Sequence, residues 1–524
     1  MVAWSKLVGA ALLVVITWEV NAATFDYGFV YDDHANIVER APAWEEGWAT
    51  FFTTRHWGAG RHAVLLSYDL DRSAPPAPGR FHVTNTVLAA AAAVLVHALA
   101  LALGIGSLGA FAAGALFAVH PLHVDAVVAI AGRAELMAAI GVLGCLLLHM
   151  RGYRPRPFGL PLACVLFVVA LASKESAACL LVLLILHDVV LAPDHRWRSL
   201  LPAYVAYGVT FAAWLLFSLA NLQTLAPIAF VDNPLASLPA AERVARAAQV
   251  LGDYFELTVW PRDLRPDRSF AVTSTSLAIG IGATLAWLAG LAACWMWRAR
   301  APRAVFALAW FPVAFAATSN IAFPIGTIMS ERLAYLPSVG PCLLVGLLVD
   351  RLSAPTRVRW LATASALTLV CTVLAFAYTA RARVWSSDGH YHEMAAAESP
   401  TSAKAHLNLG LWRARASDPE GARRSFARAL SIHPGFDRAA YHLAGVLVKG
   451  GHDDDAADVY RAYLRVAPAD TGALSQLLAI EVRLADTARA TATARRLVEL
   501  EPDNQGYVAA LTRLQRQRGD GVSP

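Results

Sequence analysis

The sequence predicts an all-α fold in which a membrane domain of about eleven helical spans precedes a C-terminal α-solenoid. Of 524 residues, 57% are hydrophobic and 16% are charged, whereas soluble proteins carry about 25% charged residues. The apolar residues form runs of the length that a membrane span needs, about 17 to 25 residues. After residue 400 the sequence becomes polar and helical in pattern, and prolines recur at a fixed interval.

Eleven apolar runs are candidate spans. The first resembles a signal peptide, with Lys6 before an apolar core and a small-residue exit at "NAA", but we expect it to be retained as a span. Residues 241–260 are helical in pattern yet contain Arg, Asp and Glu, so we interpret them as an interfacial or re-entrant helix. The expected spans are 6–24, 83–105, 107–121, 135–150, 157–173, 176–192, 199–221, 272–296, 303–319, 334–350 and 357–379.

Lys and Arg in short loops predict the orientation, because cytoplasmic loops carry an excess of these residues. With eleven spans and a cytoplasmic N-terminus, every basic cluster falls on the cytoplasmic side. The first long loop (25–82), the segment 222–271 and the C-terminal region then lie outside. The basic clusters are Arg151, Arg154 and Arg156; Arg196 and Arg198; Arg298, Arg300 and Arg303; and Arg351, Arg357 and Arg359.

The C-terminal region repeats. Pro400, Pro434, Pro468 and Pro502 follow one another at 34-residue intervals, the period of tetratricopeptide repeats. The first unit, "AHLNLGLWRARASDPEGARRSFARALSIHP", has small and large residues at the expected positions. Such repeats bind an extended peptide or protein in a concave groove, or they only brace the membrane domain. We divide the chain into a membrane domain (1–380), a connecting helix (381–400), three repeats (401–502), and a capping helix with a tail (503–524).

Composition excludes some functions. The net charge of +5 is small for this length and gives no indication of nucleic-acid binding. All six cysteines fall inside apolar runs without CxxC spacing. We interpret them as small buried side chains, and no disulfide framework or zinc site is implied. A transporter is not favoured, because we find no inverted repeat with broken spans.

Ionisable residues are costly near a bilayer, so each one is a candidate functional group. They collect at five places on the expected outer side. A lipid phosphate at that depth needs cations, and a hydroxyl acceptor losing its proton needs a carboxylate. The set therefore indicates group transfer from a lipid-phosphate donor. The five places are Asp32–Asp33, "HPLHVDAVVAIAGRAE" (120–135), "SKES" (173–176), "WPRDLRPDRSF" (260–270) and "MSERLAYLPSVGPC" (329–342).

Each motif also has a structural alternative. Asp32 and Asp33 could cap a helix at "HANIVERA" or form a solvated turn. His120 and His123 suit a tight turn; their spacing also suits two metal ligands, but no third ligand is evident nearby. The pairs Lys174–Glu175 and Glu331–Arg332 could be neutralised ion pairs at helix ends.

Taken in order, the motifs resemble the transmembrane and tetratricopeptide-repeat-containing protein O-mannosyltransferases. These are GT-C-type glycosyltransferases, multispan enzymes that use lipid-phosphate sugars. The resemblance covers residues 12–502 and favours a retained first span. The segment "PRDLRPDRSF" is only loosely similar, and the repeats are few. The matching stretches are "YDDHANI", "LFAVHPLHVDAVVAIAGRAELMAA", "LASKES" and "SERLAYLPSVGPC".

The resemblance implies a polyprenyl- or dolichyl-phosphate sugar donor, with mannose as the sugar, Ser or Thr hydroxyls of an exported protein as acceptor, and inversion at the anomeric carbon. It places the catalytic carboxylate on Asp32 or Asp33, and we prefer Asp33. Arg133, Lys174 and Arg332 are the expected phosphate-binding cations, with His120 and His123 as hydrogen-bond donors. The expected supporting carboxylates are Asp125, Glu135, Glu175 and Glu331.

The scheme requires no cofactor or metal, although a divalent metal is possible; the lipid-linked sugar is a substrate. The expected partners are the bilayer, the donor lipid and an acceptor protein in the repeat groove. The Ala-, Leu- and Arg-rich composition favours a bacterial inner membrane with the site on the periplasmic side, or the lumenal side in a eukaryote. Alternatives are sugar transfer to an envelope lipid or polysaccharide, and a non-catalytic scaffold whose repeats hold exported clients.

Overall fold

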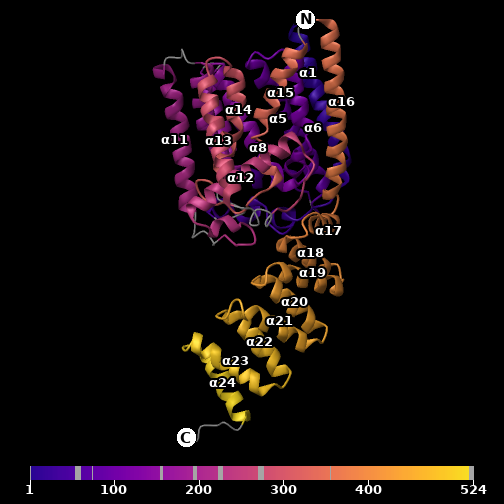
Figure 1. Cartoon of the computed structure of the whole chain (residues 1–524), viewed down its shortest axis with the longest axis vertical. Helices are drawn as coiled ribbons and strands as arrows, with labels where there is room; N and C mark the ends of the chain where they lie inside the picture. Colours follow the sequence, from indigo (N-terminus) through magenta and orange to yellow (C-terminus); the bar gives the residue numbers. More distant parts are fainter. Residues whose placement is uncertain are drawn as a thin grey trace. The chain divides into compact units, whose positions relative to one another are not determined.

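The structure is a computed structural model. It describes residues 2–53, 61–73, 75–153, 157–192, 197–221, 228–268, 277–353 and 356–518, and every regular element in these ranges is a helix (Figure 1). The all-α prediction is therefore confirmed. The chain divides into two compact units. The first contains residues 1–266 with 272–391, and the second contains residues 267–271 with 392–524.

Each of the eleven intervals expected to span a membrane holds a helix of the first unit. Asn21, near the end of the first helix, and Tyr378, in the last, share a buried hydrogen bond of 2.8 Å that joins the two ends of this unit. The helices are α1 (Val2–Asn21), α5 (Pro78–Ala102), α6 (Ser107–Val119), α8 (Arg133–Met150), α9 (Gly159–Leu171), α10 (Leu180–Leu191), α11 (Trp197–Asn221), α13 (Leu277–Trp297), α14 (Pro302–Phe315), α15 (Val339–Ser353) and α16 (Arg357–Ala382).

Length and composition identify fewer candidate membrane spans than there are helices in the eleven expected intervals. Among the described residues, six helical stretches are long and apolar enough to cross a membrane, or seven if a broken pair counts. That pair, Ser107–Val119 with Pro121–Val127, bends by 51° at His120. The protein is a membrane protein on this evidence, and the count of eleven spans stays a prediction.

The outer helices of this unit present apolar side chains at their surface. Leu216 in α11, Leu285 in α13 and Val373 in α16 are each more than half exposed. Extended apolar surface of this kind is rare on soluble proteins, whereas lipid tails cover it without cost. The same surface therefore supports a membrane location.

Small residues allow the central helices to approach closely. α1, α5, α6, α15 and α16 lie side by side (Figure 1). Where α6 crosses α15, a methyl group on Gly109 would lie 2.3 Å from the Gly346 carbonyl oxygen, and one on Gly346 would lie 2.7 Å from the Gly109 oxygen. Glycine is thus required at both positions, as is typical of helix pairs in membranes.

Short helices and turns connect the long helices at the end of the unit where the candidate site lies. α12 is long but is not among the stretches that could span a membrane; its assignment as interfacial or re-entrant stays a prediction. It packs on α13, where the Trp287 indole N–H donates to the Ala248 carbonyl at 3.1 Å. The connecting elements are η1 (Ala22–Asp26), η2 (His34–Val38), α2 (Ala43–Glu46), α3 (Trp48–Thr53), α4 (His62–Asp71), η3 (Pro121–His123), α7 (Val124–Val127), η4 (Ile130–Gly132), η5 (Glu175–Cys179), η6 (Pro234–Ser237), α12 (Ala240–Val259), η7 (Ala316–Thr318) and η8 (Glu331–Ala334).

The second unit is a stack of helix pairs, which confirms the repeats. Within the first pair, a methyl group on Gly410 would lie 2.5 Å from the Phe426 ring, so the small residue lets the two helices touch. Asp418, Asp470 and Asp486 each accept a hydrogen bond at a helix start, as N-cap residues do. The helices are α18 (Ala403–Arg415), α19 (Pro419–Ile432), α20 (Asp437–Lys449), α21 (Asp453–Leu464), α22 (Thr471–Arg483), α23 (Thr487–Leu500) and α24 (Gln505–Arg518).

The segment 381–400, expected to form one connecting helix, is interrupted in the structure. α16 ends at Ala382, a short 3-10 turn, η9 (Arg383–Trp385), follows, and α17 (Asp388–Glu398) begins after Ser387. The Ser387 hydroxyl accepts the His390 N–H at 3.3 Å. A serine that caps a new helix in this way interrupts the preceding one. The predicted ranges of the domains stay a prediction.

Candidate active site

The structure brings Asp32 of the first loop against Arg332 of η8, although 300 residues separate them in the sequence. Two guanidinium nitrogens of Arg332 lie 3.5 Å from Asp32 Oδ2. Each side chain is about a quarter exposed, at 25% and 26%. The contact between Asp32 and Arg332 is therefore long, and both side chains are accessible from outside the protein.

Asp33 has a different environment from its neighbour. Its carboxylate is buried and accepts two backbone N–H groups, from Val30 at 3.0 Å and from Ala131 at 2.9 Å. It does not cap the helix that follows it, so the helix-cap interpretation is wrong for this residue. Asp33 instead ties the first loop to the turn before α8. The geometry favours Asp32 as the reactive carboxylate, the reverse of the sequence-based preference.

Asp32 and Asp33 diverge for a reason that the sequence did not show. Both residues lie in a helical turn, where successive side chains point about 100° apart. Tyr31 enters this turn with φ +52°, an uncommon conformation for a residue with a side chain. Its N–H donates to Asp388 at 2.9 Å, and its ring stacks on Tyr391. Asp388 and Tyr391, which follow α16 in the sequence, therefore fix the turn that carries both carboxylates.

Two further cations lie near Arg332. Lys174 Nζ is 2.6 Å from Glu135 Oε1, and both side chains are buried. The Arg61 guanidinium donates two hydrogen bonds to the Glu175 carboxylate, at 2.8 and 3.2 Å. Arg61, Lys174 and Arg332 lie close enough for their positive charges to interact electrostatically. Burial lowers the pKa of Lys174, against the opposing effect of Glu135.

Arg61 is the residue that the sequence reasoning missed. It lies in the first loop, outside the five stretches in which the ionisable residues collect. Its place is fixed by the Ala63 N–H, which donates to the Ala172 carbonyl at 3.0 Å and so pins the start of α4 to the "SKES" loop. Arg61 is one of five arginines in the first loop (25–82), and its place in the sequence does not distinguish it from the other four.

The remaining carboxylates position the loop that carries Arg332. Asp125 Oδ2 accepts the Ser330 hydroxyl and the Arg332 N–H, each at 3.0 Å. Glu331 is buried, accepts the Arg265 N–H and lies 3.6 Å from Arg381. Asp125 therefore holds the backbone of Arg332 directly, and Glu331 ties the preceding position to Arg265 and Arg381. Their role as supporting carboxylates stays a prediction.

Arg133 does not belong to this group, which corrects its predicted role in binding phosphate. The side chain is completely buried. Its nitrogens donate to Asn85 at 2.7 Å, to the Ser67 carbonyl at 2.9 Å and to the Phe81 carbonyl at 3.1 Å, and one lies 2.6 Å from Asp71. With its donors used by the protein, Arg133 fastens α8 to α4 and α5.

His120 and His123 are also corrected. The ring nitrogens of His120 contact the Thr258 carbonyl at 2.9 Å and the Leu122 N–H at 3.2 Å. Those of His123 contact the Phe117 carbonyl at 2.7 Å and the Ser338 hydroxyl at 2.8 Å. Both side chains are buried and both nitrogens of each are occupied, so the tight-turn alternative describes them and neither can donate to a phosphate.

The charges of the site decide which cation a phosphate can reach. Three cations (Arg61, Lys174 and Arg332) face four carboxylates, Asp32, Asp125, Glu135 and Glu175. An incoming phosphate must therefore replace a carboxylate partner. Lys174 and Arg61 hold theirs at 2.6 and 2.8 Å, whereas Arg332 holds Asp32 only at 3.5 Å. Arg332 is the cation that can change partner at the lowest cost.

The burial of Asp33 predicts a pH dependence of stability. Burial raises its pKa to about 7, although the N–H groups of Val30 and Ala131 act in the opposite direction. The unfolded chain releases this proton near pH 4. The folded state therefore binds more protons between about pH 4 and 7, and stability should fall as pH rises through that range. Melting curves of purified protein should show a smaller decrease from pH 5 to 7.5 in Asp33→Asn than in the wild type. Equal slopes would contradict this assignment.

Comparisons with known proteins agree with the resemblance drawn from the motifs. A family model described as Tetratricopeptide repeat matches residues 413–480. The chain is 26% identical to the protein O-mannosyl-transferase F38B6.6 of Caenorhabditis elegans, over 63% of this chain and 46% of that protein. It is 24% identical to the protein O-mannosyl-transferase TMTC3 of Mus musculus, over 78% of this chain and 49% of that one. It is 26% identical to the protein O-mannosyl-transferase TMTC4 of Homo sapiens, over 78% and 63% respectively.

The recognition from motifs is therefore confirmed: the homologues carry the name of the family that those motifs resemble. The chain spans about half the length of the first two relatives.

Proposed function

We propose that this protein is a membrane glycosyltransferase that moves mannose from a polyprenyl- or dolichyl-phosphate donor to Ser or Thr hydroxyls of exported proteins. The observation that carries the proposal is the open pair of Asp32 and Arg332, a carboxylate and a cation at the same accessible point. The names of the homologues and the apolar helices of the first unit support the class of reaction.

In the proposed reaction, Arg332 acts first and Asp32 acts second. The donor phosphate pairs with Arg332, and this releases Asp32 from its contact. The acceptor hydroxyl oxygen attacks the anomeric carbon while Asp32 takes the hydroxyl proton. The bond from that carbon to the phosphate oxygen breaks, and its electron pair stays on the lipid phosphate. Arg332 stabilises the charge that develops there.

We propose that the second unit engages the acceptor protein, since tetratricopeptide repeats form surfaces for extended peptides. The candidate site and the repeats would then both face the extracytoplasmic side, as the distribution of Lys and Arg predicts. The test is a transfer assay with the purified full chain, polyprenyl-phosphate mannose and a panel of Ser/Thr peptides, read by mass spectrometry. Mannosylated peptide supports the proposal. Modified lipid without modified peptide favours transfer to the envelope, and no transfer to either acceptor class favours a scaffold.

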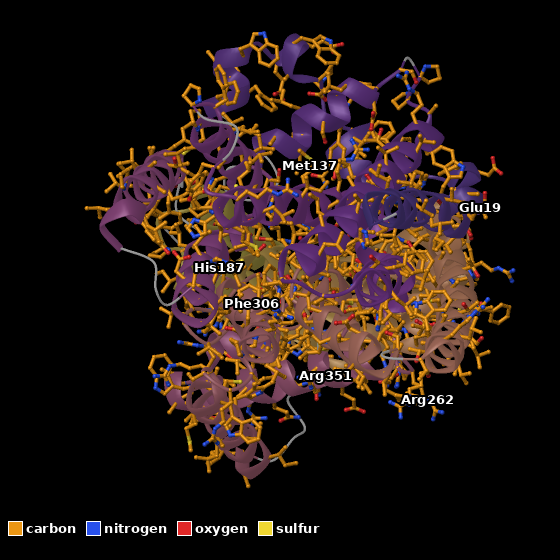
Figure 2. The ribbon with its side chains drawn as sticks, turned by 90° about the horizontal axis from the view of Figure 1, so that it is seen from above. Glu19, Met137, His187, Arg262, Phe306 and Arg351 are labelled. Atoms are coloured by element: carbon orange, nitrogen blue, oxygen red, sulfur yellow. The ribbon has the colours of Figure 1, made fainter. Side chains whose placement is uncertain are left out.

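Replacing Arg332 with glutamine should raise the KM for the donor about tenfold to hundredfold, because a hydrogen bond to a charged group contributes about 1.5–3 kcal/mol. The KM for the acceptor peptide should change little. Arg262→Gln is the matched control, since Arg262, which is labelled in Figure 2, is exposed in the same unit. Its guanidinium stacks on Trp260. Equal donor KM values for the two variants would remove Arg332 from the donor site.

A further inference from the structure

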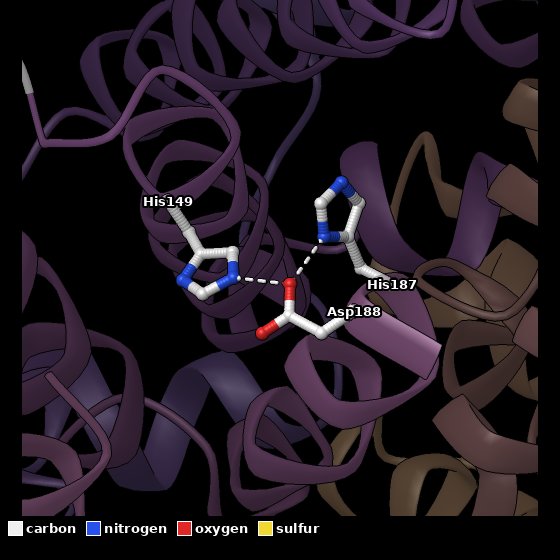
Figure 3. Close-up of side chains that lie close together, drawn as sticks. All are labelled: His149, His187 and Asp188. Carbon is white, nitrogen blue, oxygen red and sulfur yellow. Dashed lines mark hydrogen bonds and ion pairs between the residues drawn. The ribbon is translucent and has the colours of Figure 1, made fainter. Parts of the chain in front are cut away.

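A second cluster of polar side chains lies far from the candidate active site. His149 lies in the last turn of α8, and His187 and Asp188 lie in the last turns of α10. Their ligand atoms all lie within 4.8 Å of one another, and all three residues are buried (Figure 3). Glu135 and His149 stand 14 positions apart in α8, which places this cluster about 21 Å along the helix from the Lys174–Glu135 pair.

The three side chains converge on one atom. His149 Nε2 and His187 Nδ1 each lie 2.8 Å from Asp188 Oδ1, as the dashed lines show (Figure 3). Neighbouring positions of a helix do not normally face each other, yet the side chains of His187 and Asp188 meet. Two imidazole nitrogens thus meet at one carboxylate oxygen.

Two tyrosine hydroxyls fix the orientation of His149 and Asp188. The Tyr153 hydroxyl lies 2.7 Å from His149 Nδ1, and the Tyr204 hydroxyl donates to Asp188 Oδ2 at 2.7 Å. Tyr153 adopts φ +57° to reach this position. Metal-binding histidines characteristically use their second ring nitrogen in such a contact, and metal-binding carboxylates are likewise hydrogen-bonded. Both features are present here.

We propose that His149, His187 and Asp188 bind a divalent transition-metal ion of the Zn²⁺ class. Imidazole with a single carboxylate suits such ions, whereas Mg²⁺ and Ca²⁺ prefer sites built wholly of oxygen. Zn²⁺ at about 2.1 Å from each ligand holds tetrahedral ligand atoms about 3.4 Å apart. The two 2.8 Å contacts would each need to lengthen by about 0.6 Å to admit the ion.

The ion would join the ends of three helices. His149 comes from α8, His187 and Asp188 from α10, and the partner Tyr204 from α11. His187 also packs edge-on against Phe306 of α14, with ring centroids 6.3 Å apart; both are labelled in Figure 2. Arg151, which is expected on the cytoplasmic side, follows His149 closely in the chain. The site thus lies at the other end of α8 from the Lys174–Glu135 pair, away from the proposed transfer chemistry.

The test is metal content. The full chain, purified in detergent through a tag without histidine, is equilibrated with Zn²⁺, desalted and measured by inductively coupled plasma mass spectrometry. We expect about one Zn²⁺ per chain in the wild type, and loss of bound metal in His149→Gln and Asp188→Asn. His97→Gln is the matched control, since His97 is buried in α5 outside the cluster, and it should retain the metal. Co²⁺ bound in place of Zn²⁺ should give the visible absorption of a tetrahedral N/O site.

A milder change keeps the proposal testable if those variants fold poorly. Tyr153→Phe removes only the hydroxyl on His149, and it should weaken Zn²⁺ binding 10- to 100-fold, as loss of such a partner does elsewhere. Zn²⁺ should also raise the Tm of the wild type more than that of Tyr153→Phe. The proposal is overturned if the wild type retains less than about a tenth of an ion per chain, or if wild type and His149→Gln bind equally. The cluster is then a closed hydrogen-bond network.

Discussion

Asp32→Asn is expected to lower kcat for sugar transfer by about 10²- to 10⁴-fold, the usual contribution of a general base. Asparagine keeps the size of the side chain but cannot accept the hydroxyl proton. Asp32 is partly exposed, and its carboxylate contacts Arg332 over a long distance of 3.5 Å, so the substitution should leave the melting temperature close to that of the wild type. The measurement is initial rate with saturating donor and peptide, together with a melting curve of the same preparation.

Asp26→Asn provides the control. Asp26 is an exposed carboxylate in the same loop, so the substitution removes the same charge near the same surface. We expect its kcat to stay within about twofold of the wild type, because it does not touch Arg332. If Asp32→Asn keeps more than about a tenth of wild-type kcat, Asp32 is not the base. If the two variants lose activity equally, the effect is one of net charge.

The sequence predicted which segments meet better than it predicted what each side chain does there. Because polar groups are costly in a bilayer, residues such as Asp32, Lys174 and Arg332 could be recognised from their place at the ends of apolar runs. Their meeting at one end of the helices followed from the expected topology. The pairing of Arg332 with Asp32, and of Lys174 with Glu135, did not follow, because it depends on how the loops between the helices fold.

The wrong roles predicted for Arg133 and His123 also arise because the folding of the loops cannot be seen in the sequence. Arg133 and His123 belong to the motif-bearing loop and carry donors, so they were indistinguishable by sequence from groups that face a ligand. Whether a donor points to the protein or to an open site depends on neighbours distant in the chain, such as Asp71 for Arg133 and Ser338 for His123. The His149 cluster was missed for the converse reason: its residues lie within apolar spans and match no spacing motif.

Arg133→Met is expected to destabilise the first unit by about 3–5 kcal/mol, the cost of breaking a buried ion pair by removing one partner. Methionine fills much of the same volume, but it leaves Asp71 without its 2.6 Å partner and Asn85 without its 2.7 Å donor. The carbonyl oxygens of Ser67 and Phe81 lose their donors as well. Thermal unfolding in detergent should show a clear decrease in Tm, and less folded protein should be recovered at the growth temperature.

Arg80→Met separates this effect from the loss of any arginine, because Arg80 is exposed at the start of α5; its Tm should change by little. The kinetics of the folded fraction then test the correction to the sequence-based assignment. If Arg133 only fastens α8 to α4 and α5, the Arg133→Met molecules that remain folded should bind the donor with wild-type KM. A donor KM raised tenfold or more, without a loss of stability, would show instead that Arg133 reaches the phosphate. Its structural role would then be wrong.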